Sequence, residues 1–179
     1  MIYLYHGTDA EFDTPIPERG RRGTDFGQGF YLTPDREFTY RWAAADAVVN
    51  EYELDEEGLQ IHRFQRDVDW FRYIFQNRRV RDTLSADVII GPISNDTIFD
   101  TLGIISSGFL SESEAMKLLM IGPEYTQVVL KTPKAAEQLR WLWSEKITKP
   151  DAEHWKAERD AYAVALAKAV QEITGEEGG

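Results

Sequence analysis

Residues 25–33, with the sequence Asp-Phe-Gly-Gln-Gly-Phe-Tyr-Leu-Thr, constrain the fold more than any other part of the chain. Gly27 and Gly29 come directly before residues 30–33, an apolar run that is typical of a short strand. The glycine fingerprint of dinucleotide-binding folds follows a strand and opens a helix, and a phosphate-binding loop requires a longer glycine motif that ends in lysine. The sequence therefore disfavours a Rossmann fold, a nucleoside-triphosphate loop and an NAD(P)-dependent oxidoreductase.

Apolar runs and helical patterns follow one another irregularly along the chain. The runs predict strands at residues 2–5, 30–33, 48–54, 59–64, 87–93 (broken by Gly91-Pro92) and 125–131. Apolar spacings of three and four predict helices at residues 34–45, 67–80, 96–102, 111–120 (with a capping box from Ser111 to Glu114), 133–143 and 151–173. Residues 9–28, which mix proline and glycine with charges, predict a long loop of the kind that is often functional. Without regular β–α–β alternation, these elements predict an α+β domain.

The composition excludes several kinds of site and location. The 179 residues contain no cysteine, so disulfides, a thiolate nucleophile and cysteine-ligated metals are excluded. The three histidines, at positions 6, 62 and 154, lack ligand spacing, so we predict no metal site. The N-terminus lacks the basic and apolar regions of a signal peptide, and no stretch approaches the roughly 20 apolar residues of a membrane span. We therefore expect a cytoplasmic protein that does not contact membranes.

The charge of the chain bears on its partners. A net charge of −11 disfavours a large nucleic-acid footprint, because acidic chains repel phosphate backbones. Arginines at 19, 21 and 22, and at 78, 79 and 81, form two basic patches that leave nucleic acid open as a partner.

Three segments carry residues typical of chemistry: residues 5–8 (Tyr-His-Gly-Thr), residues 25–33, and residues 125–130 (Tyr-Thr-Gln-Val-Val-Leu). The pairing of His-Gly-Thr with Phe-Gly-x-Gly-Phe-Tyr resembles the His–Tyr–Glu class of ADP-ribosyltransferases, which includes diphtheria toxin and the poly(ADP-ribose) polymerases. The chain looks most similar to a family of small bacterial proteins grouped with that fold, and the likeness extends to about Leu139. It implies a split pair of small antiparallel or mixed sheets with flanking helices, and NAD⁺ as a substrate bound in a cleft between the sheets.

The resemblance assigns roles to the residues that match the family pattern. His6 would bind a ribose hydroxyl of NAD⁺, and the backbone of Gly7 would hold the nicotinamide amide. Tyr31 would stack on the nicotinamide ring, where an aromatic face gains about 0.5–2 kcal/mol against a cation, and Tyr40 or Trp42 would supply the opposite wall. The structural alternatives are a histidine bonded to backbone, a turn glycine and packed aromatic residues. The other NAD⁺-binding residues that we predict are Thr8, Arg19, Arg22, Gly29 and Phe30.

The arginines of the long loop could clamp a pyrophosphate, because guanidinium groups bind it through two parallel hydrogen bonds. The alternative is a solvated loop. Asp25 could hold a ribose hydroxyl or only fix the turn.

Gln127 departs from the family pattern, because it matches the position of the catalytic glutamate. A carboxylate there would stabilise the developing positive charge and orient the nucleophile. Glutamine still accepts a hydrogen bond but is neutral and takes no proton. Cleavage of the nicotinamide bond therefore remains possible, whereas elongation to poly(ADP-ribose) is not expected. The structural alternative is a polar residue on an edge strand.

Three functions fit these residues, and we favour the first. It is a mono-ADP-ribosyltransferase that modifies protein or nucleic acid, which the family context associates with bacterial toxins, phage conflict and an antitoxin or other protein partner. The second is a degenerate module that binds NAD⁺ or ADP-ribose, and the third is an NAD⁺ glycohydrolase. We expect a transferase-like domain at residues 1–143 and a C-terminal helical extension at residues 144–179.

Overall fold

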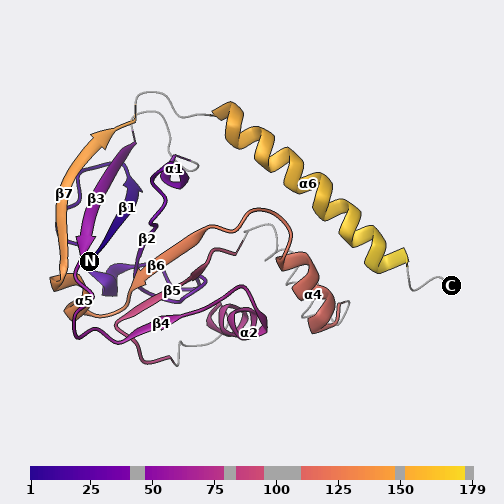
Figure 1. The fold of residues 1–179 in the computed structure, drawn as a ribbon, viewed down its shortest axis with the longest axis horizontal. Helices are drawn as coiled ribbons and strands as arrows, with labels where there is room; N and C mark the ends of the chain where they lie inside the picture. The colour runs from indigo at the N-terminus through magenta and orange to yellow at the C-terminus, as the bar shows by residue number, and fades with distance from the viewer. Residues whose placement is uncertain (41–46, 79–83, 95–109, 148–151, 176–179) are drawn as a thin grey trace.

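A computed structural model of the chain describes residues 1–40, 47–78, 84–94, 110–147 and 152–175. Its strands form two small sheets (Figure 1). The first sheet is antiparallel and contains, in order, β1 (Ile2–Thr8), β3 (Val48–Leu54) and β7 (Leu139–Lys146). The second sheet is mixed and contains, in order, β2 (Phe30–Leu32), β6 (Thr126–Leu130), β5 (Val88–Pro92) and β4 (Ile61–Arg63). Backbone hydrogen bonds of 2.8 and 3.0 Å between Tyr5 and Thr33 connect the two sheets.

The described helices are α1 (Arg36–Thr39), α2 (Val68–Asn77), α4 (Glu112–Leu119), α5 (Pro133–Glu137) and α6 (Ala152–Gly175), with a short 3-10 helix at Pro17–Arg19. Four of the described helices, α1, α2, α4 and α5, begin at residues whose side chains bind the first free amides. Asp35 and Asp67 accept from backbone amides at the starts of α1 and α2. The predicted capping box of Ser111 and Glu114 is confirmed at α4.

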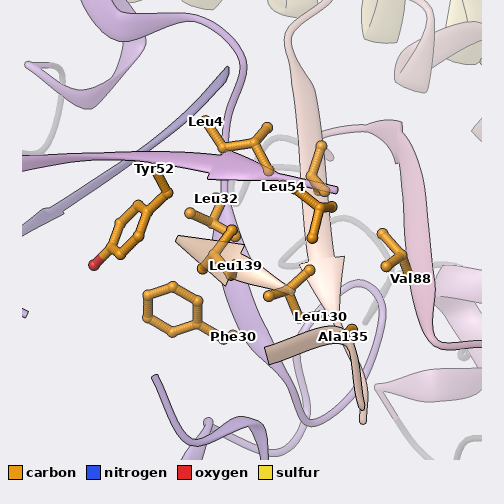
Figure 2. Close-up of a cluster of buried hydrophobic side chains, with 10 residues drawn as sticks. Leu4, Phe30, Leu32, Tyr52, Leu54, Val88, Leu130, Ala135 and Leu139 are labelled. Carbon is orange, nitrogen blue, oxygen red and sulfur yellow. The ribbon is translucent and has the colours of Figure 1, made fainter. Parts of the chain in front are cut away.

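The two sheets and the helices α2 and α4 form three layers, and clusters of hydrophobic side chains pack between them. Between the sheets, Leu4, Tyr52 and Leu54 of the first sheet meet Phe30 and Leu130 of the second (Figure 2). The opposite face of the second sheet packs against α2 and α4 through a second cluster. The core members of this cluster are Phe26, Trp70, Phe71, Ile74, Ile89, Ala115, Leu119 and Val129. The second sheet is thus buried on both faces, which fits the nearly continuous apolar runs of β5 and β6.

The structure confirms the α+β fold with two small sheets and a long C-terminal helix. Strands are present at each of the predicted positions, and β1 continues through His6, Gly7 and Thr8. The predicted break in β5 is wrong, because Gly91 and Pro92 remain paired with β6. The long loop is confirmed apart from its 3-10 turn. The helix predicted at residues 96–102 and the continuation of α1 past residue 40 lie outside the described residues.

The helix predicted over residues 133–143 is confirmed only over Pro133–Glu137 and is wrong from Leu139 onward. Helix α5 ends at Glu137, and β7 follows from Leu139. The pairing of β7 with β3 shifts between Glu51 and Tyr52, so that Leu142 is an extra residue in a β-bulge. The bulge interrupts the alternation that would have identified a strand. The predicted domain boundary after residue 143 falls within this strand.

Candidate functional site

A polar cleft of about 430 Å³ lies at one end of the second sheet, on the face that carries α2 and α4. Tyr31 pairs with Val129 across β2 and β6, and Gln127 is two residues away from Val129. Because paired residues and residues two apart share a face of a sheet, Tyr31 and Gln127 lie on the same face. The lining residues are Arg21, Thr24, Asp25, Tyr31, Phe38, Arg66, Arg78, Ile93, Ser94, Ile121, Gly122, Pro123, Tyr125, Gln127, Glu158 and Tyr162.

The amide of Gln127 is held in one orientation. Its Nε2 donates to Asp25 Oδ2 and to the Pro92 carbonyl oxygen, both at 3.0 Å. Both partners only accept hydrogen bonds, so the nitrogen must face them and Oε1 must face elsewhere. Within the described residues, no hydrogen bond engages Oε1. Gln127 is only 5 % exposed and lines the cleft, so Oε1 is a fixed acceptor at this site.

Asp25 is the anion that organises this end of the cleft. Its Oδ1 accepts from Arg78 Nε (3.1 Å), Arg78 Nη2 (2.6 Å) and Ser94 Oγ (2.8 Å). Its Oδ2 accepts from Ser94 N (2.9 Å) and Gln127 Nε2 (3.0 Å). Such a set of donors compensates for burying a carboxylate. Asp25 therefore ties the loop to the ends of α2, β5 and β6.

Tyr31 is fixed through its hydroxyl group. The hydroxyl accepts from Phe26 N at 3.0 Å and lies 2.7 Å from both Thr24 Oγ1 and the Gly27 carbonyl oxygen. Burial raises the pKa of Tyr31 above its usual value, so the hydroxyl stays protonated near neutral pH. The glycine-containing turn thereby holds the half-buried ring against the cleft.

His6 lies beside β2 but does not line the cleft. Its Nδ1 is 2.8 Å from the carbonyl oxygen of Tyr31, which can only accept, so Nδ1 donates and Nε2 is an acceptor. The His6 ring packs on Phe30 with 4.6 Å between the ring centroids, and the centroid of the Phe12 ring lies 6.4 Å from that of His6. Burial lowers the pKa of His6 despite the hydrogen bond to Tyr31, so the ring is neutral near pH 7.

The other predicted residues have varied surroundings. Gly7 lies against α1, where an added Cβ would be 3.4 Å from the Thr39 carbonyl oxygen. Gly29 packs against β6, because its Cβ would be 2.7 Å from the Leu130 carbonyl oxygen. Phe30 is buried between the sheets. Tyr40 is half-buried after α1.

Of the predicted site residues that the structure describes, Tyr31 and Gln127 line the cleft and eight do not: His6, Gly7, Thr8, Arg19, Arg22, Gly29, Phe30 and Tyr40. Thr8 bonds Asp9 at 3.1 Å, and Arg19 and Arg22 are exposed outside the lining, whereas their neighbour Arg21 belongs to it. Trp42 lies outside the described residues.

Several lining residues carry no signal in the sequence. Arg66 donates to the carbonyl oxygens of Ile121 (2.9 Å) and Gly122 (3.1 Å), and burial lowers its pKa. Glu158 and Tyr162 come from α6 and complete the lining of the cleft. These residues lie far apart in the sequence, and no motif spacing connects them.

The fold and the cleft define an α+β protein with two small sheets and a polar cleft at the end of the second. The chain belongs to the family described as "Protein of unknown function (DUF3990)", whose model matches residues 2–141. The match includes six strands and the start of β7, and it ends before α6. No curated protein and no solved structure matches the chain. In the part of the chain that the structure describes, no helix could span a membrane.

Proposed function

We propose that this protein is a mono-ADP-ribosyltransferase that cleaves NAD⁺ and transfers ADP-ribose to a macromolecule. The observation that carries the proposal is the pair of fixed acceptors on either side of Tyr31. His6 Nδ1 is committed to the Tyr31 backbone, and Gln127 Nε2 is committed to Asp25 and Pro92. Each side chain therefore presents an acceptor atom, Nε2 or Oε1, of the kind that ribose hydroxyls require.

The likeness to the His–Tyr–Glu class gives these acceptors their roles. His6 would bind a ribose hydroxyl, Gly7 would bind the nicotinamide amide through its backbone, and the Tyr31 ring would stack on nicotinamide. Arg21, which lines the cleft, is better placed for the pyrophosphate than Arg19 or Arg22. A neutral imidazole suits the role of His6, because its Nε2 can accept a hydrogen bond from a ribose hydroxyl, which a cationic ring cannot.

The target and biological setting belong to the same proposal. The family likeness suggests a bacterial toxin or conflict-system effector, acting in the cytoplasm and restrained by a protein partner. Protein and nucleic acid both remain candidate acceptors, since the chain is acidic overall while arginines 21, 66 and 78 line the cleft.

One observation favours a second candidate, a module that binds NAD⁺ or ADP-ribosyl groups without turnover. Gln127 has no proton-accepting group, and its amide is tied to Asp25 in a way that suits an amide better than a carboxylate. Such a site could still recognise ribose hydroxyls.

The test follows both halves of NAD⁺ during the reaction. Purified protein is incubated with adenine-labelled NAD⁺ and cell lysate, and we measure released nicotinamide and labelled macromolecules. We expect both signals, and we expect His6→Ala and Tyr31→Leu to reduce them at least 10-fold, a loss of about 1.4 kcal/mol of transition-state stabilisation. His62→Ala is the matched control and should leave both unchanged, because His62 lies on β4 and its ring packs on Phe64.

The outcomes separate the candidates. Nicotinamide release without labelled macromolecules would indicate a glycohydrolase. NAD⁺ binding without nicotinamide release would refute the transferase and support the binding module. Equal loss in His6→Ala and His62→Ala would show that the effect is not specific to the site.

A further inference from the structure

Helix α6 lies outside the residues that match the family, yet it forms part of the cleft. It runs along one side of the molecule past α4 (Figure 1). Among the α6 side chains that the structure describes, those not exposed repeat at spacings of three and four: Trp155, Glu158, Tyr162, Leu166, Ala169 and Ile173. This spacing places them on one face of the helix. Glu158 is the charged member of this otherwise uncharged face, and it lines the cleft.

We propose that Glu158 supplies the carboxylate that the proposed reaction requires and that β6 lacks at position 127. This inference rests on the proposed transferase function. Glu158 is half-buried on the docking face of α6, and partly removing a carboxylate from water costs free energy that a hydrophobic side chain would not cost there. A catalytic role accounts for the carboxylate at this position.

The geometry connects Glu158 to the site through Tyr125. The Tyr125 hydroxyl donates to Glu158 Oε2 at 2.5 Å, and the Tyr125 ring meets Trp155 edge-on at 6.4 Å. Tyr125 is two residues before Gln127, and its carbonyl oxygen continues the pairing with β5 by accepting from Ile93 N. Tyr125 and Gln127 therefore point to the same face.

The other carboxylate among the described lining residues, Asp25, is unsuited to this role. Both its oxygens are engaged by Arg78, Ser94 and Gln127, and the residue is only 5 % exposed. Protonating it would weaken these bonds. Position 127 is equally unsuited, because a carboxylate there would face Asp25 and the Pro92 carbonyl oxygen.

The step balances without a further reagent. The bond between the ribose C1′ and the nicotinamide nitrogen breaks, and nicotinamide leaves as a neutral molecule with the electron pair. The Glu158 carboxylate stabilises the positive charge that develops on the ribose. A nucleophilic X–H group of the acceptor bonds to C1′, and its proton passes to Glu158 and then to solvent.

The test is Glu158→Gln in the full chain, with Glu172→Gln as the matched control. Glu172 is on the same helix, with a side chain that is 65 % exposed. Glutamine still accepts from Tyr125, so we expect an unchanged melting temperature and NAD⁺ affinity within about 3-fold of wild type. We expect nicotinamide release to fall by roughly 10²–10⁴-fold, the usual contribution of a general base.

Each result has a definite meaning. If the wild type is active and Glu158→Gln is equally active, the role of Glu158 is refuted, whereas the proposed transferase function is not. Absence of nicotinamide release by the wild type would overturn both proposals. If Glu158→Gln unfolds, Glu158→Asp decides: a folded and partly active aspartate variant supports the role of the charge, whereas a folded and inactive one overturns it.

Discussion

Replacing Gln127 by the glutamate of the His–Tyr–Glu pattern should destabilise this protein rather than improve it. Gln127 Nε2 donates to a carboxylate and to a carbonyl oxygen, and a glutamate has no hydrogen to offer either when ionised. Two carboxylates at hydrogen-bonding distance repel each other, so one takes up a proton. We therefore expect the introduced glutamate to be neutral in the folded state and to donate its single proton to Asp25.

The expected loss of stability is set mainly by the cost of protonating the introduced glutamate. Protonating a carboxyl group of ordinary pKa near 4.3 at pH 7 costs about 4 kcal/mol. The lost hydrogen bond to Pro92 adds about 1 kcal/mol. We expect Gln127→Glu to be about 4–5 kcal/mol less stable at pH 7, which lowers the melting temperature by roughly 8–20 °C in a chain of this size.

The pH dependence distinguishes this cause from a packing defect. The pKa of the introduced carboxyl group is raised in the folded state, so the variant loses least stability below about pH 4.3, and the loss grows as pH rises toward the folded pKa. Urea unfolding followed by tryptophan fluorescence should give a penalty that is about 2.7 kcal/mol smaller at pH 5 than at pH 7.

Two further variants complete the experiment. Gln138→Glu is the matched control, because Gln138 Nε2 donates to the carbonyl oxygens of Asp55 (2.9 Å) and Glu57 (3.0 Å) and faces no carboxylate. The double variant Asp25→Asn with Gln127→Glu has one carboxylate at the site and should recover the pH-dependent part of the loss. A stable Gln127→Glu at pH 7, or a loss independent of pH, would refute the reasoning.

Two other predictions concern His6 and the long loop. Burial lowers the pKa of His6, so its contribution to stability is present above about pH 6.5 and is lost as the pH falls through the folded pKa. We expect His6→Phe to reduce the difference between the free energies of unfolding measured in urea at pH 7.5 and pH 5.5. An unchanged difference would contradict a lowered pKa of His6. Gly20→Ala should cost about 3 kcal/mol or more in thermal unfolding, because its Cβ would lie 2.0 Å from the Gly29 carbonyl oxygen. Gly23→Ala, with open space but a φ of 74°, should cost only about 1 kcal/mol, and equal losses would disprove the close packing.

Most of the fold could be predicted from local sequence patterns. Strands such as β3 and β6 are apolar runs bounded by turn residues, and the start of α4 carries its capping box in the sequence. The strand β7 was missed because Leu142 is a bulge residue. The bulge places Trp141 opposite Tyr52 and Trp143 opposite Glu51, so the two tryptophans do not lie on the same face of the sheet. An apolar pattern with that irregularity resembles a helix as much as a strand.

The cleft could be predicted only in part. The likeness to a known class identified Tyr31 and Gln127, and the structure places both in the lining of one cleft. It did not identify Arg66, because a solitary arginine has no recognisable spacing, and Arg78 was noted only as part of a basic patch. Asp25 was recognised as either a ligand residue or a turn residue, and the structure shows it bonded to Arg78, 53 positions away. Partners at such a distance are set by tertiary packing and leave no local pattern.

The environments of Asp25 and Glu158 differ in a way that bears on regulation. Asp25 is held by donors that do not belong to α6, so its carboxyl group stays in the cleft whether or not α6 is docked. Glu158 is present only when α6 is docked, and the docking depends on close contacts, since a Cβ at Gly122 would lie 2.9 Å from the Tyr162 ring. If Glu158 acts as we propose, any partner that draws α6 away removes the carboxylate, together with Tyr162, and leaves the lining residues from the rest of the chain in place. Such a partner would abolish transfer while NAD⁺ still binds, whereas one that blocks the cleft would abolish both.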